Sequence, residues 1–579
     1  MSTLNQTHKN NSRFVHLYDT TLRDGSQRKG LSFSLEDKLK ITRLLDAFGV
    51  SYIEGGWPGS NPKDMEYFRR VGAMHLQNSK VVAFGATCRV GTQAEDDTNL
   101  RALVESGTPC VTIVGKSSVF HVERVLETTR EENLRLIADS IAYLKSHNLE
   151  VMFDAEHFFD GYRVNPEYSL QCLRAAAKAG ADWVVLCDTN GGSLPNYVAE
   201  VVRTVVDAGM AKVGVHCHND AELAVANSLA AVDAGARQVQ GTINGYGERC
   251  GNTNLVSVVP ALQLKQNYQC VAPEHMHSLT ELSRSVAEIA NLNPDPYAPY
   301  VGASAFAHKA GLHVAAVEKV SASYEHVEPS TVGNERQVIV SELSGRGNIR
   351  MLASELGLRV GGNEQAILRQ VKELEEKGYQ FENAEGTVEL MMRRSKPDYV
   401  RPFELVDMSV VVSDRSKTGD TTAEAVVKVR VENVVYHTAS EGTGPVHALD
   451  LALRKALQQS YPQIVDVRLA DYKVRILDPD SATNATTRVT IEATSGDDRW
   501  CTVGCSTNII DASYQALADS LELFLVRNDD PVGASACTTS TAAGCAPESD
   551  CDVHVMQALA PTEVNVVQAL APTEQEVVA

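Results

Sequence analysis

The chain has 579 residues, of which 43% are hydrophobic and 22% are charged, a composition typical of a folded protein with room for several domains. Its formal net charge of −21 argues against nucleic acid or an anionic membrane as the main partner. No apolar run is long enough to span a bilayer, and the first residues lack the apolar core of a signal peptide, so we expect a soluble cytoplasmic protein.

Residues 14–285 repeat one strand-and-helix unit. Apolar runs that we expect to form strands begin near residues 14, 50, 80, 109, 149, 182, 212 and 237. Ser34 can cap the first helix together with Asp37, and Gly49 follows that helix where a left-handed residue is needed. Eight continuous apolar strands, each followed by a helix, predict an α/β fold of the closed (β/α)8 TIM-barrel type. The alternative is an open doubly wound sheet, which would be long for one domain.

The strand-and-helix rhythm stops after the eighth unit. Residues 286–395 contain helical patterns at 341–357 and 364–378, which predict a helical connector. Residues 396–529 contain strand patterns followed by a helical pattern, twice over, which predicts a duplicated α+β C-terminal domain. The expected elements are strands at 403–412 and 422–433, a helix at 446–459, strands at 466–477, 487–495 and 499–506, and a helix at 509–525.

Both ends of the chain differ from the rest in composition. Residues 1–13 and 530–579 are expected to be disordered. The second of these segments is of low complexity, with "VMQALAPTE" recurring as "VVQALAPTE". Neither segment has enough large apolar side chains to build a core.

Polar side chains follow three strands that a closed barrel would make neighbours. The first strand leads into "YDTTLRDGSQ", the seventh ends in "HCHND" and the eighth leads into "NGYGERCGNTNL". Barrel active sites lie at the carboxyl ends of the strands, so these groups should converge. The candidates are Asp19, Arg23, Asp24, Gln27, His216, His218, Glu248, Arg249 and Asn252.

These residue types suit a divalent metal ion. Alternate residues of a strand point to the same face, so His216 and His218 should aim at one place. Two imidazoles, a carboxylate and an amide oxygen form a mixed nitrogen and oxygen ligand set suited to Mn²⁺, Zn²⁺ or Mg²⁺. Spacing alone leaves open whether Asp19 or Asp24 supplies the carboxylate.

Other strand ends and the connector carry further polar groups, for which solubility and turn formation are the alternative explanation. These groups are Asp154, Glu156 and His157 after the fifth strand, Asp188, Thr189 and Asn190 after the sixth, and His308 and His313 in the connector.

Taken together and in this order, "DTTLRDGSQ", "HCHND" and "GERCGNTNL" resemble the family of 2-isopropylmalate, homocitrate and citramalate synthases. Within it, "YIEGGWPGSNPKD" and "FDAEHFFDGY" resemble the citramalate synthase branch. The resemblance implies a Claisen-type condensation of acetyl-CoA with pyruvate, giving (R)-citramalate and CoA in isoleucine biosynthesis. The alternative within the family is 2-isopropylmalate synthesis from 2-oxoisovalerate, in leucine biosynthesis.

Two further hypotheses lie outside this family. One is a lyase of the same superfamily that cleaves a carbon–carbon bond of an acyl-CoA. The other is an amino-acid-binding regulatory protein with an inert barrel. The duplicated C-terminal domain argues against the first, and the intact ligand set argues against the second.

The resemblance also assigns roles to the metal-binding and substrate-binding residues. It implies that Asp24, His216 and His218 bind the metal ion, with Asn252 as a weaker ligand. It further implies that Arg23 faces the keto oxygen of the 2-oxo acid and stabilises developing alkoxide charge. Gln27 and Thr189 are the other expected substrate-binding residues, with Thr189 at the carboxylate.

The remaining implied roles concern the acetyl group and the partner subunit. Glu156 corresponds to an acid near the acetyl group, and His313 to a histidine that reaches the barrel of a partner subunit, with Tyr324 near it. Relatives often carry an acidic residue two positions after this histidine, where this chain has Ala315. The C-terminal domain resembles a dimeric amino-acid-binding module, which implies a homodimer with feedback inhibition by isoleucine.

Overall fold

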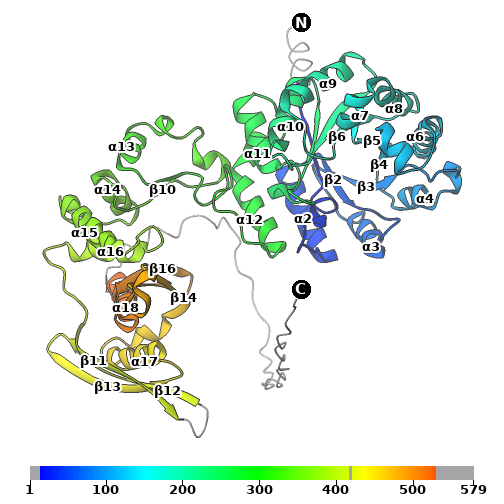
Figure 1. Ribbon diagram of the computed structural model, residues 1–579. Helices are drawn as coiled ribbons and strands as arrows, with labels where there is room; N and C mark the ends of the chain where they lie inside the picture. The colour runs from blue at the N-terminus through cyan, green and yellow to red at the C-terminus, as the bar shows by residue number, and fades with distance from the viewer. Residues whose placement is uncertain (1–12, 416–419, 530–579) are drawn as a thin grey trace, which may run out of the picture.

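A computed structural model describes residues 13–415 and 420–529 (Figure 1). The N-terminal half is a closed barrel of eight parallel strands in sequence order, as the spacing of apolar runs predicted. The barrel closes where β1 pairs with β8, with Leu17 opposite Val239. Its strands are β1 (His16–Asp19), β2 (Tyr52–Gly56), β3 (Lys80–Ala86), β4 (Cys110–Lys116), β5 (Glu150–Glu156), β6 (Trp183–Asp188), β7 (Lys212–Cys217) and β8 (Gln238–Gly241).

Helices surround the barrel and shield its strands, most of which are buried along nearly their whole length. Ser34 and Asp37 form the expected capping box at the start of the first helix, and Gly49 ends this helix with a φ of 96°. Gly107, Gly180 and Gly235 are also left-handed, each just before a strand. The helices are α2 (Leu35–Phe48), α3 (Pro62–Val71), α4 (Thr98–Glu105), α5 (Val119–Arg124), α6 (Arg130–Ser146), α7 (Phe158–Val164), α8 (Pro166–Lys178), α9 (Pro195–Asp207), α10 (Ala224–Asp233) and α11 (Leu255–Pro260).

The connector is mainly helical, as expected, and has a small core of its own that includes Ile349, Ile367, Val371 and Met392. A short parallel pair of strands lies between its first helices, which the sequence patterns did not predict. Its elements are α12 (Leu279–Ile289), β9 (Ala307–His308), α13 (Gly311–Lys319), β10 (Gln337–Val338), α14 (Arg346–Glu355), α15 (Glu364–Glu376) and α16 (Glu385–Arg394).

The C-terminal domain contains two copies of a unit made of three antiparallel strands and a helix. The two copies share one core, in which Leu449 and Leu453 of the first helix join Leu517 and Leu521 of the second. The first unit is β11 (Glu404–Arg415), β12 (Asp420–Val431), β13 (Val434–Gly442) and α17 (Pro445–Leu457). The second unit is β14 (Arg468–Ile476), β15 (Thr487–Ser495), β16 (Asp498–Ser506) and α18 (Ile509–Asp529).

The strand β13 was not among the predicted elements. Its sequence, VVYHTASEG, does not alternate apolar with polar residues as a half-buried strand usually does, and only Thr438 is buried. Its place depends on pairing with β12 and on packing of the sheet against α17.

None of the helices in the described ranges combines the length and the apolar character that crossing a bilayer requires. The predicted disorder of residues 1–13 and 530–579 concerns segments that lie outside the described residues, apart from Arg13.

Candidate active site at the carboxyl ends of the barrel strands

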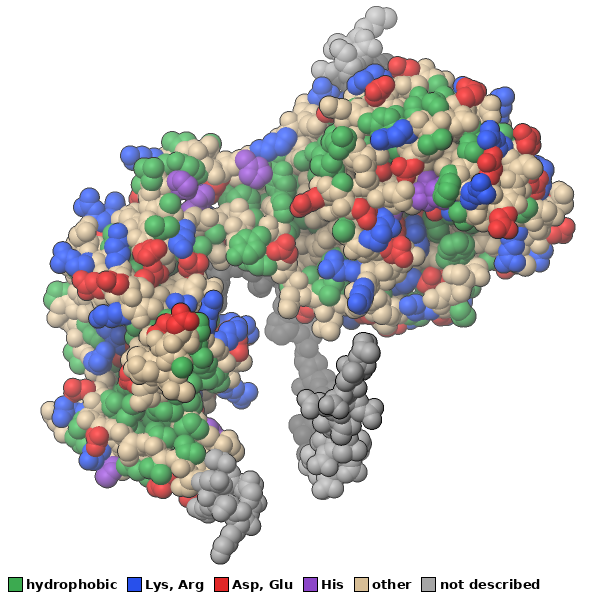
Figure 2. Space-filling model, viewed as in Figure 1, with side chains coloured by type: hydrophobic (Ala, Val, Ile, Leu, Met, Phe, Trp, Pro, Cys, Tyr) green, Lys and Arg blue, Asp and Glu red, His purple; other side chains and the backbone are tan. Residues whose placement is uncertain are grey.

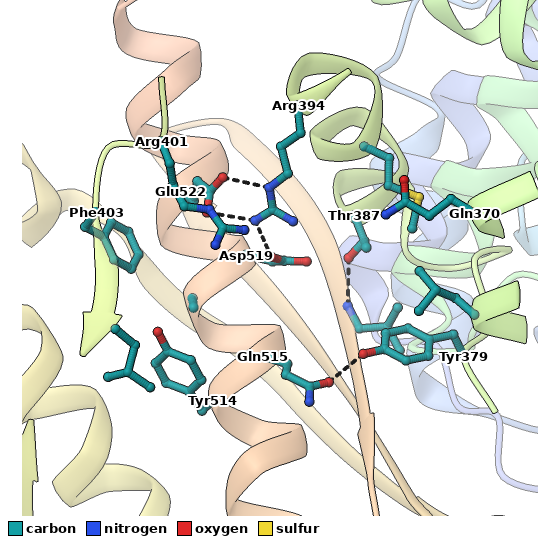
Figure 3. A pocket seen from close by; sticks show the side chains of 15 residues that line it. Gln370, Tyr379, Thr387, Arg394, Arg401, Phe403, Tyr514, Gln515, Asp519 and Glu522 are labelled. Carbon is teal, nitrogen blue, oxygen red and sulfur yellow. Dashed lines mark hydrogen bonds and ion pairs between the residues drawn. The ribbon is translucent and has the colours of Figure 1, made fainter. Parts of the chain in front are cut away.

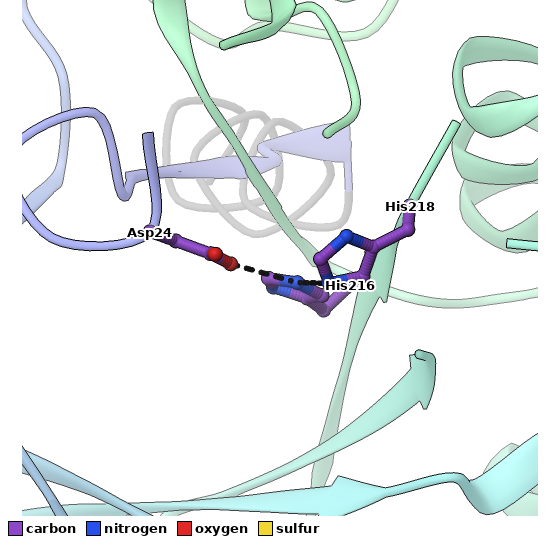
Figure 4. A group of neighbouring side chains, drawn as sticks. All are labelled: Asp24, His216 and His218. Carbon is purple, nitrogen blue, oxygen red and sulfur yellow. Dashed lines mark hydrogen bonds and ion pairs between the residues drawn. The ribbon is translucent and has the colours of Figure 1, made fainter. Parts of the chain in front are cut away.

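Three buried side chains from two barrel segments form a potential metal-binding group (Figure 4). Ligand atoms of Asp24, His216 and His218 all lie within 4.8 Å of one another. The Nε2 atom of His216 is 3.3 Å from Asp24 Oδ2 and 3.3 Å from His218 Nε2. Two imidazole nitrogens and a carboxylate oxygen that converge in this way are a ligand set for a divalent cation.

The electrostatics of the group agree with metal binding. Burial, and next the neighbouring His216, lower the pKa of His218 to about 4, which keeps this imidazole neutral. A neutral imidazole offers a lone pair to a metal ion, whereas a protonated one does not. Burial opposes the charge on Asp24, but Arg23 and the neighbouring His216 outweigh this effect and hold the pKa of the carboxyl below its ordinary value.

Asn252 lies beside this group because residues 218 and 252 form an isolated antiparallel bridge. Its Nδ2 donates to the Tyr246 carbonyl at 3.2 Å, while its Oδ1 is buried with no hydrogen-bond partner among the described residues. Gly247, at φ 155°, permits this approach, since a Cβ there would lie 2.2 Å from Asn252 Nδ2. An orphaned buried oxygen on the bridge partner of His218 fits the role of a further, weaker ligand.

The structure distinguishes the two aspartates that spacing left open. Asp19 is fully buried and turns toward its own loop, where it accepts hydrogen bonds from Thr21 N at 3.0 Å and Thr21 Oγ1 at 2.8 Å. Burial raises the pKa of Asp19 to about 7. Asp19 therefore braces the loop after β1, and Asp24 faces the histidines.

Arg23 is held from two sides. Its Nε donates to Glu54 Oε1 at 2.5 Å, and its guanidinium carbon lies 3.8 Å from the centre of the Phe84 ring. The hydroxyl of Tyr18 donates to the other Glu54 oxygen at 2.6 Å. Burial disfavours the guanidinium charge, but the carboxylates of Glu54 and Asp24 outweigh it and raise the pKa of Arg23.

Glu54 and Phe84 were missed at the sequence level. The available signal was a single carboxylate inside the otherwise uncharged run "VSYIEGG", because an unpaired charge is rarely buried in a strand.

A cavity of ≈ 250 Å³ opens above the group and is walled by residues from all around the barrel. Gln27, Glu156 and Thr189, each a candidate from the sequence, reach this cavity. Its lining comprises Arg23, Asp24, Gln27, Trp57, Phe84, Val114, Asp154, Glu156, Cys187, Thr189, His216, His218, Glu248 and Arg249.

Ion pairs and hydrogen bonds connect the polar residues that line the cavity. Glu156 forms an ion pair with Lys116, a residue that the sequence did not single out. The Thr189 hydroxyl accepts a hydrogen bond from His157 N at 2.8 Å, so its own proton is available to another acceptor. Arg249 binds Asp220 twice and donates to the Thr189 carbonyl at 2.8 Å, which links the loops after β6, β7 and β8.

Four of the weaker candidates have structural partners. The His157 ring stacks on His121 at 3.7 Å, and Asp188 accepts from Ser193 Oγ at 2.8 Å. Asn190 donates to Asp160, and His308 contacts Glu325 at 3.1 Å. These side chains fasten loops or the connector, in agreement with the alternative given for them.

His313 and Tyr324 do not line the cavity of their own chain. His313 lies on α13 of the connector, and its ring stacks on Tyr324 at a centroid distance of 4.1 Å and an angle of 27°. Figure 1 shows α13 at the upper edge of the connector, apart from the barrel. The pair therefore takes no part in the lining of this cavity.

The chain matches three family models in succession. These are "HMGL-like" over residues 14–286, "Homocitrate synthase post-HMGL domain-like" over 300–379, and "LeuA allosteric (dimerisation) domain" over 382–525. The matches cover the barrel, most of the connector and the C-terminal domain in turn.

Full-length relatives give the same assignment. An (R)-citramalate synthase of Geobacter sulfurreducens is 48% identical over 522 residues, 90% of this chain and 99% of that protein. One of Synechocystis is 50% identical over 521 residues, 87% of this chain and 95% of that protein. A 2-isopropylmalate synthase of Methanocaldococcus jannaschii is 30% identical over 523 residues, 89% of this chain and 95% of that protein. The chain thus belongs to the 2-isopropylmalate, homocitrate and citramalate synthase family, on its citramalate synthase branch.

Proposed function

We propose that the protein is a metal-dependent acyltransferase that condenses acetyl-CoA with pyruvate to (R)-citramalate and CoA, in isoleucine biosynthesis. The observation that carries the proposal is the convergence of Asp24, His216 and His218 beside Arg23 in one cavity. Similarity to (R)-citramalate synthases over about nine-tenths of the chain supports the choice of reaction.

The metal site fits a divalent cation such as Mn²⁺, Zn²⁺ or Mg²⁺. Asp24, His216 and His218 would hold the ion, and the unpartnered Oδ1 of Asn252 would be a weaker ligand. Once bound, the ion would act as a Lewis acid that polarises the keto group of the 2-oxo acid.

Arg23 is suited to stabilise negative charge that develops on the keto oxygen. Glu54 and Phe84 fix its guanidinium before substrate arrives, so no reorganisation is needed during the reaction. On the opposite wall, the Thr189 hydroxyl can donate to the substrate carboxylate, because its oxygen already accepts from a backbone N–H. The Gln27 amide lies on the same cavity wall as Arg23.

Carbon–carbon bond formation requires a base near the acetyl methyl group. We assign this role to His313, assisted by Tyr324, from the connector of a partner subunit. The base removes a methyl proton, the enolate carbon bonds to the keto carbon, and the keto oxygen receives the electron pair and then a proton. Glu156, paired with Lys116, lies on the cavity wall where it can orient the acetyl group. Water then cleaves the thioester and releases CoA.

We further propose a homodimer that isoleucine inhibits through residues 396–529. The match to an allosteric (dimerisation) domain supports this proposal. Exposed apolar side chains on the strands of that domain also support it, and Figure 2 shows hydrophobic side chains gathered there. They include Val411, Val412, Val434, Leu469 and Ile476. A second copy of the chain would cover such a surface. A cytoplasmic location, without nucleic acid or membrane as a partner, stays a prediction from composition.

A panel of 2-oxo acids with acetyl-CoA tests the reaction, with CoA release as the readout. We expect the highest kcat/KM with pyruvate. Faster turnover of 2-oxoisovalerate would replace the proposal by 2-isopropylmalate synthesis, the second candidate.

Chelator treatment should abolish activity and Mn²⁺ should restore it, whereas full activity of the demetallated protein would contradict the metal-dependent mechanism. Isothermal titration with isoleucine tests the regulatory proposal, which absence of binding would refute.

A further inference from the structure

Below the metal-binding group, one glutamine connects a ligand histidine to the barrel interior. Gln240 of β8 is fully buried, and its Oε1 lies 2.9 Å from Nδ1 of His216. Its Nε2 lies 3.0 Å from Oδ1 of Asp154 on β5. A continuous series of contacts thus runs from the metal-binding group through an amide to a buried carboxylate.

The surroundings of Gln240 decide which way its amide points. Its Nε2 faces two acceptors, Asp154 Oδ1 at 3.0 Å and Gln238 Oε1 at 3.5 Å. Beside an ionised Asp154, an amide oxygen in that place would face only other acceptors, and a buried acceptor without a donor is unfavourable. The Oε1 atom must therefore face His216.

The amide orientation in turn fixes the tautomer of His216. An amide oxygen only accepts hydrogen bonds, so the proton of the neutral imidazole sits on Nδ1. The lone pair is then on Nε2, the atom that points at Asp24 and His218 at 3.3 Å from each. With the other tautomer, a proton would occupy the place of the cation.

We propose that Gln240 is a positioning residue of the metal site, which holds His216 in its metal-binding tautomer and ring orientation and is itself anchored by Asp154. The proposal rests on the metal-binding group of the proposed function. Outer partners of ligand histidines commonly change metal affinity by about 10- to 100-fold when they are replaced. Gln240 acts through His216 and does not touch the ion.

The test uses two variants of the full-length protein and Mn²⁺ alone as the probe. Gln240→Met keeps the length and approximate volume of the side chain but removes the acceptor, and the Kd for Mn²⁺ should rise about 10- to 100-fold. The double variant Gln240→Glu with Asp154→Asn exchanges carboxylate and amide. Its carboxylate can accept from both His216 and the new amide, so Kd should return to within about threefold of the native value.

The single variant Gln240→Glu is the comparison for the double variant, because it places two carboxylates against each other in a buried site. The matched control is Thr42→Val, which removes a buried hydroxyl bound to Tyr67 and to a helix carbonyl in the same barrel. Binding is measured by calorimetry on chelator-treated protein, and circular dichroism confirms folding. Electron spin echo spectroscopy of bound Mn²⁺ reports whether two imidazoles coordinate.

Weaker binding by Gln240→Met, together with rescue in the double variant and an unchanged control, supports the proposal. Equal Kd values for native protein and Gln240→Met would overturn it and leave the proposed function intact. If the native protein bound no Mn²⁺, both would fall. Should Gln240→Met not fold, the comparison of Gln240→Glu with the double variant decides, and absence of rescue counts against the proposal.

Discussion

Asp19 ends β1 and Asp24 lies five positions further along the chain, and the two carboxylates have different roles. Asp24 faces two imidazoles, whereas Asp19 accepts two hydrogen bonds from Thr21. We predict that Asp24→Asn weakens Mn²⁺ binding by at least about 100-fold, because the amide carries no charge and His216 loses its anionic neighbour. Calorimetric titration of both variants checks this.

Asp19→Asn is the control for that prediction. It lies at the β1 end of the same loop and should leave Kd within about threefold of the native value, provided that the loop stays folded. Equal losses in the two variants would mean that the loop, not the Asp24 carboxylate, determines binding.

Glu54 determines where the guanidinium of Arg23 lies. We predict that Glu54→Gln lowers kcat by about 10- to 100-fold with a smaller change in KM. A displaced Arg23 would stabilise the charge that develops in the transition state less well, whereas binding of the substrate depends on it less. Tyr18→Phe removes only one hydrogen bond to Glu54 and should reduce kcat by less than about tenfold. A rise in KM with unchanged kcat would show instead that Glu54 serves ground-state binding.

In the connector, one buried carboxylate joins elements on either side of Tyr324. Glu325 has a side chain that is 1% exposed and binds Arg336 twice at 2.5 Å, with further contacts to Ser321 at 2.6 Å and His308 at 3.1 Å. Hydrogen bonds from Arg336 are the largest influence and hold the pKa of Glu325 at about 2. This cluster fixes the segment that carries Tyr324.

The depressed pKa predicts how the stability of the connector depends on pH. A carboxyl whose pKa is lower in the folded state stabilises that state above its unfolded pKa, and the stabilisation is lost as pH falls toward the folded value. Glu325→Gln should cost about 2 kcal/mol at pH 7, and the difference from native protein should shrink as pH falls from 5 to 2. Hydrogen exchange of residues 321–338, corrected for intrinsic rates, measures it.

Glu328 provides the matched control for this prediction. It is largely exposed and lies 4.0 Å from the same arginine, so Glu328→Gln should change stability by less than about 0.5 kcal/mol at any of these pH values. A pH-independent difference for Glu325→Gln would indicate loss of packing and not loss of charge.

For the whole molecule, His313 lies outside the cavity of its own chain, and the proposed function assigns it to the site of a partner subunit. We predict that His313→Ala and His216→Gln are each inactive, and that co-expressed chains regain activity in mixed dimers. One of the two sites in a mixed dimer then combines an intact barrel with an intact connector. Purified mixed dimers should therefore show about half of native activity, and an unpurified, randomly paired mixture about a quarter.

Tagged chains purified by two affinity steps provide the mixed dimers, and CoA release measures their activity. If the mixed dimers are inactive, His313 either acts in the site of its own chain or has no catalytic role. Sedimentation of the double-purified protein confirms that the two chains associate.

Much of the architecture is determined by local sequence. Eight apolar runs at regular spacing can bury their strands only with helices between them, and this periodicity is visible without any contact information. The loop motifs that contain Asp24, His216 and Asn252 follow strands that become neighbours when the barrel closes, so their convergence was predictable as well.

Tertiary structure alone decided the rest, because it depends on contacts between segments far apart in the chain. Glu54 meets Arg23 across 31 positions, and Gln240 meets Asp154 across 86. Similarly, β13 is a strand only because β12 and α17 provide its partners. Spacing did not separate Asp24 from Asp19; the family resemblance implied Asp24, and the directions of the two side chains agree with that choice. Periodicity records which face of a segment is buried, but not which distant side chain it will meet there.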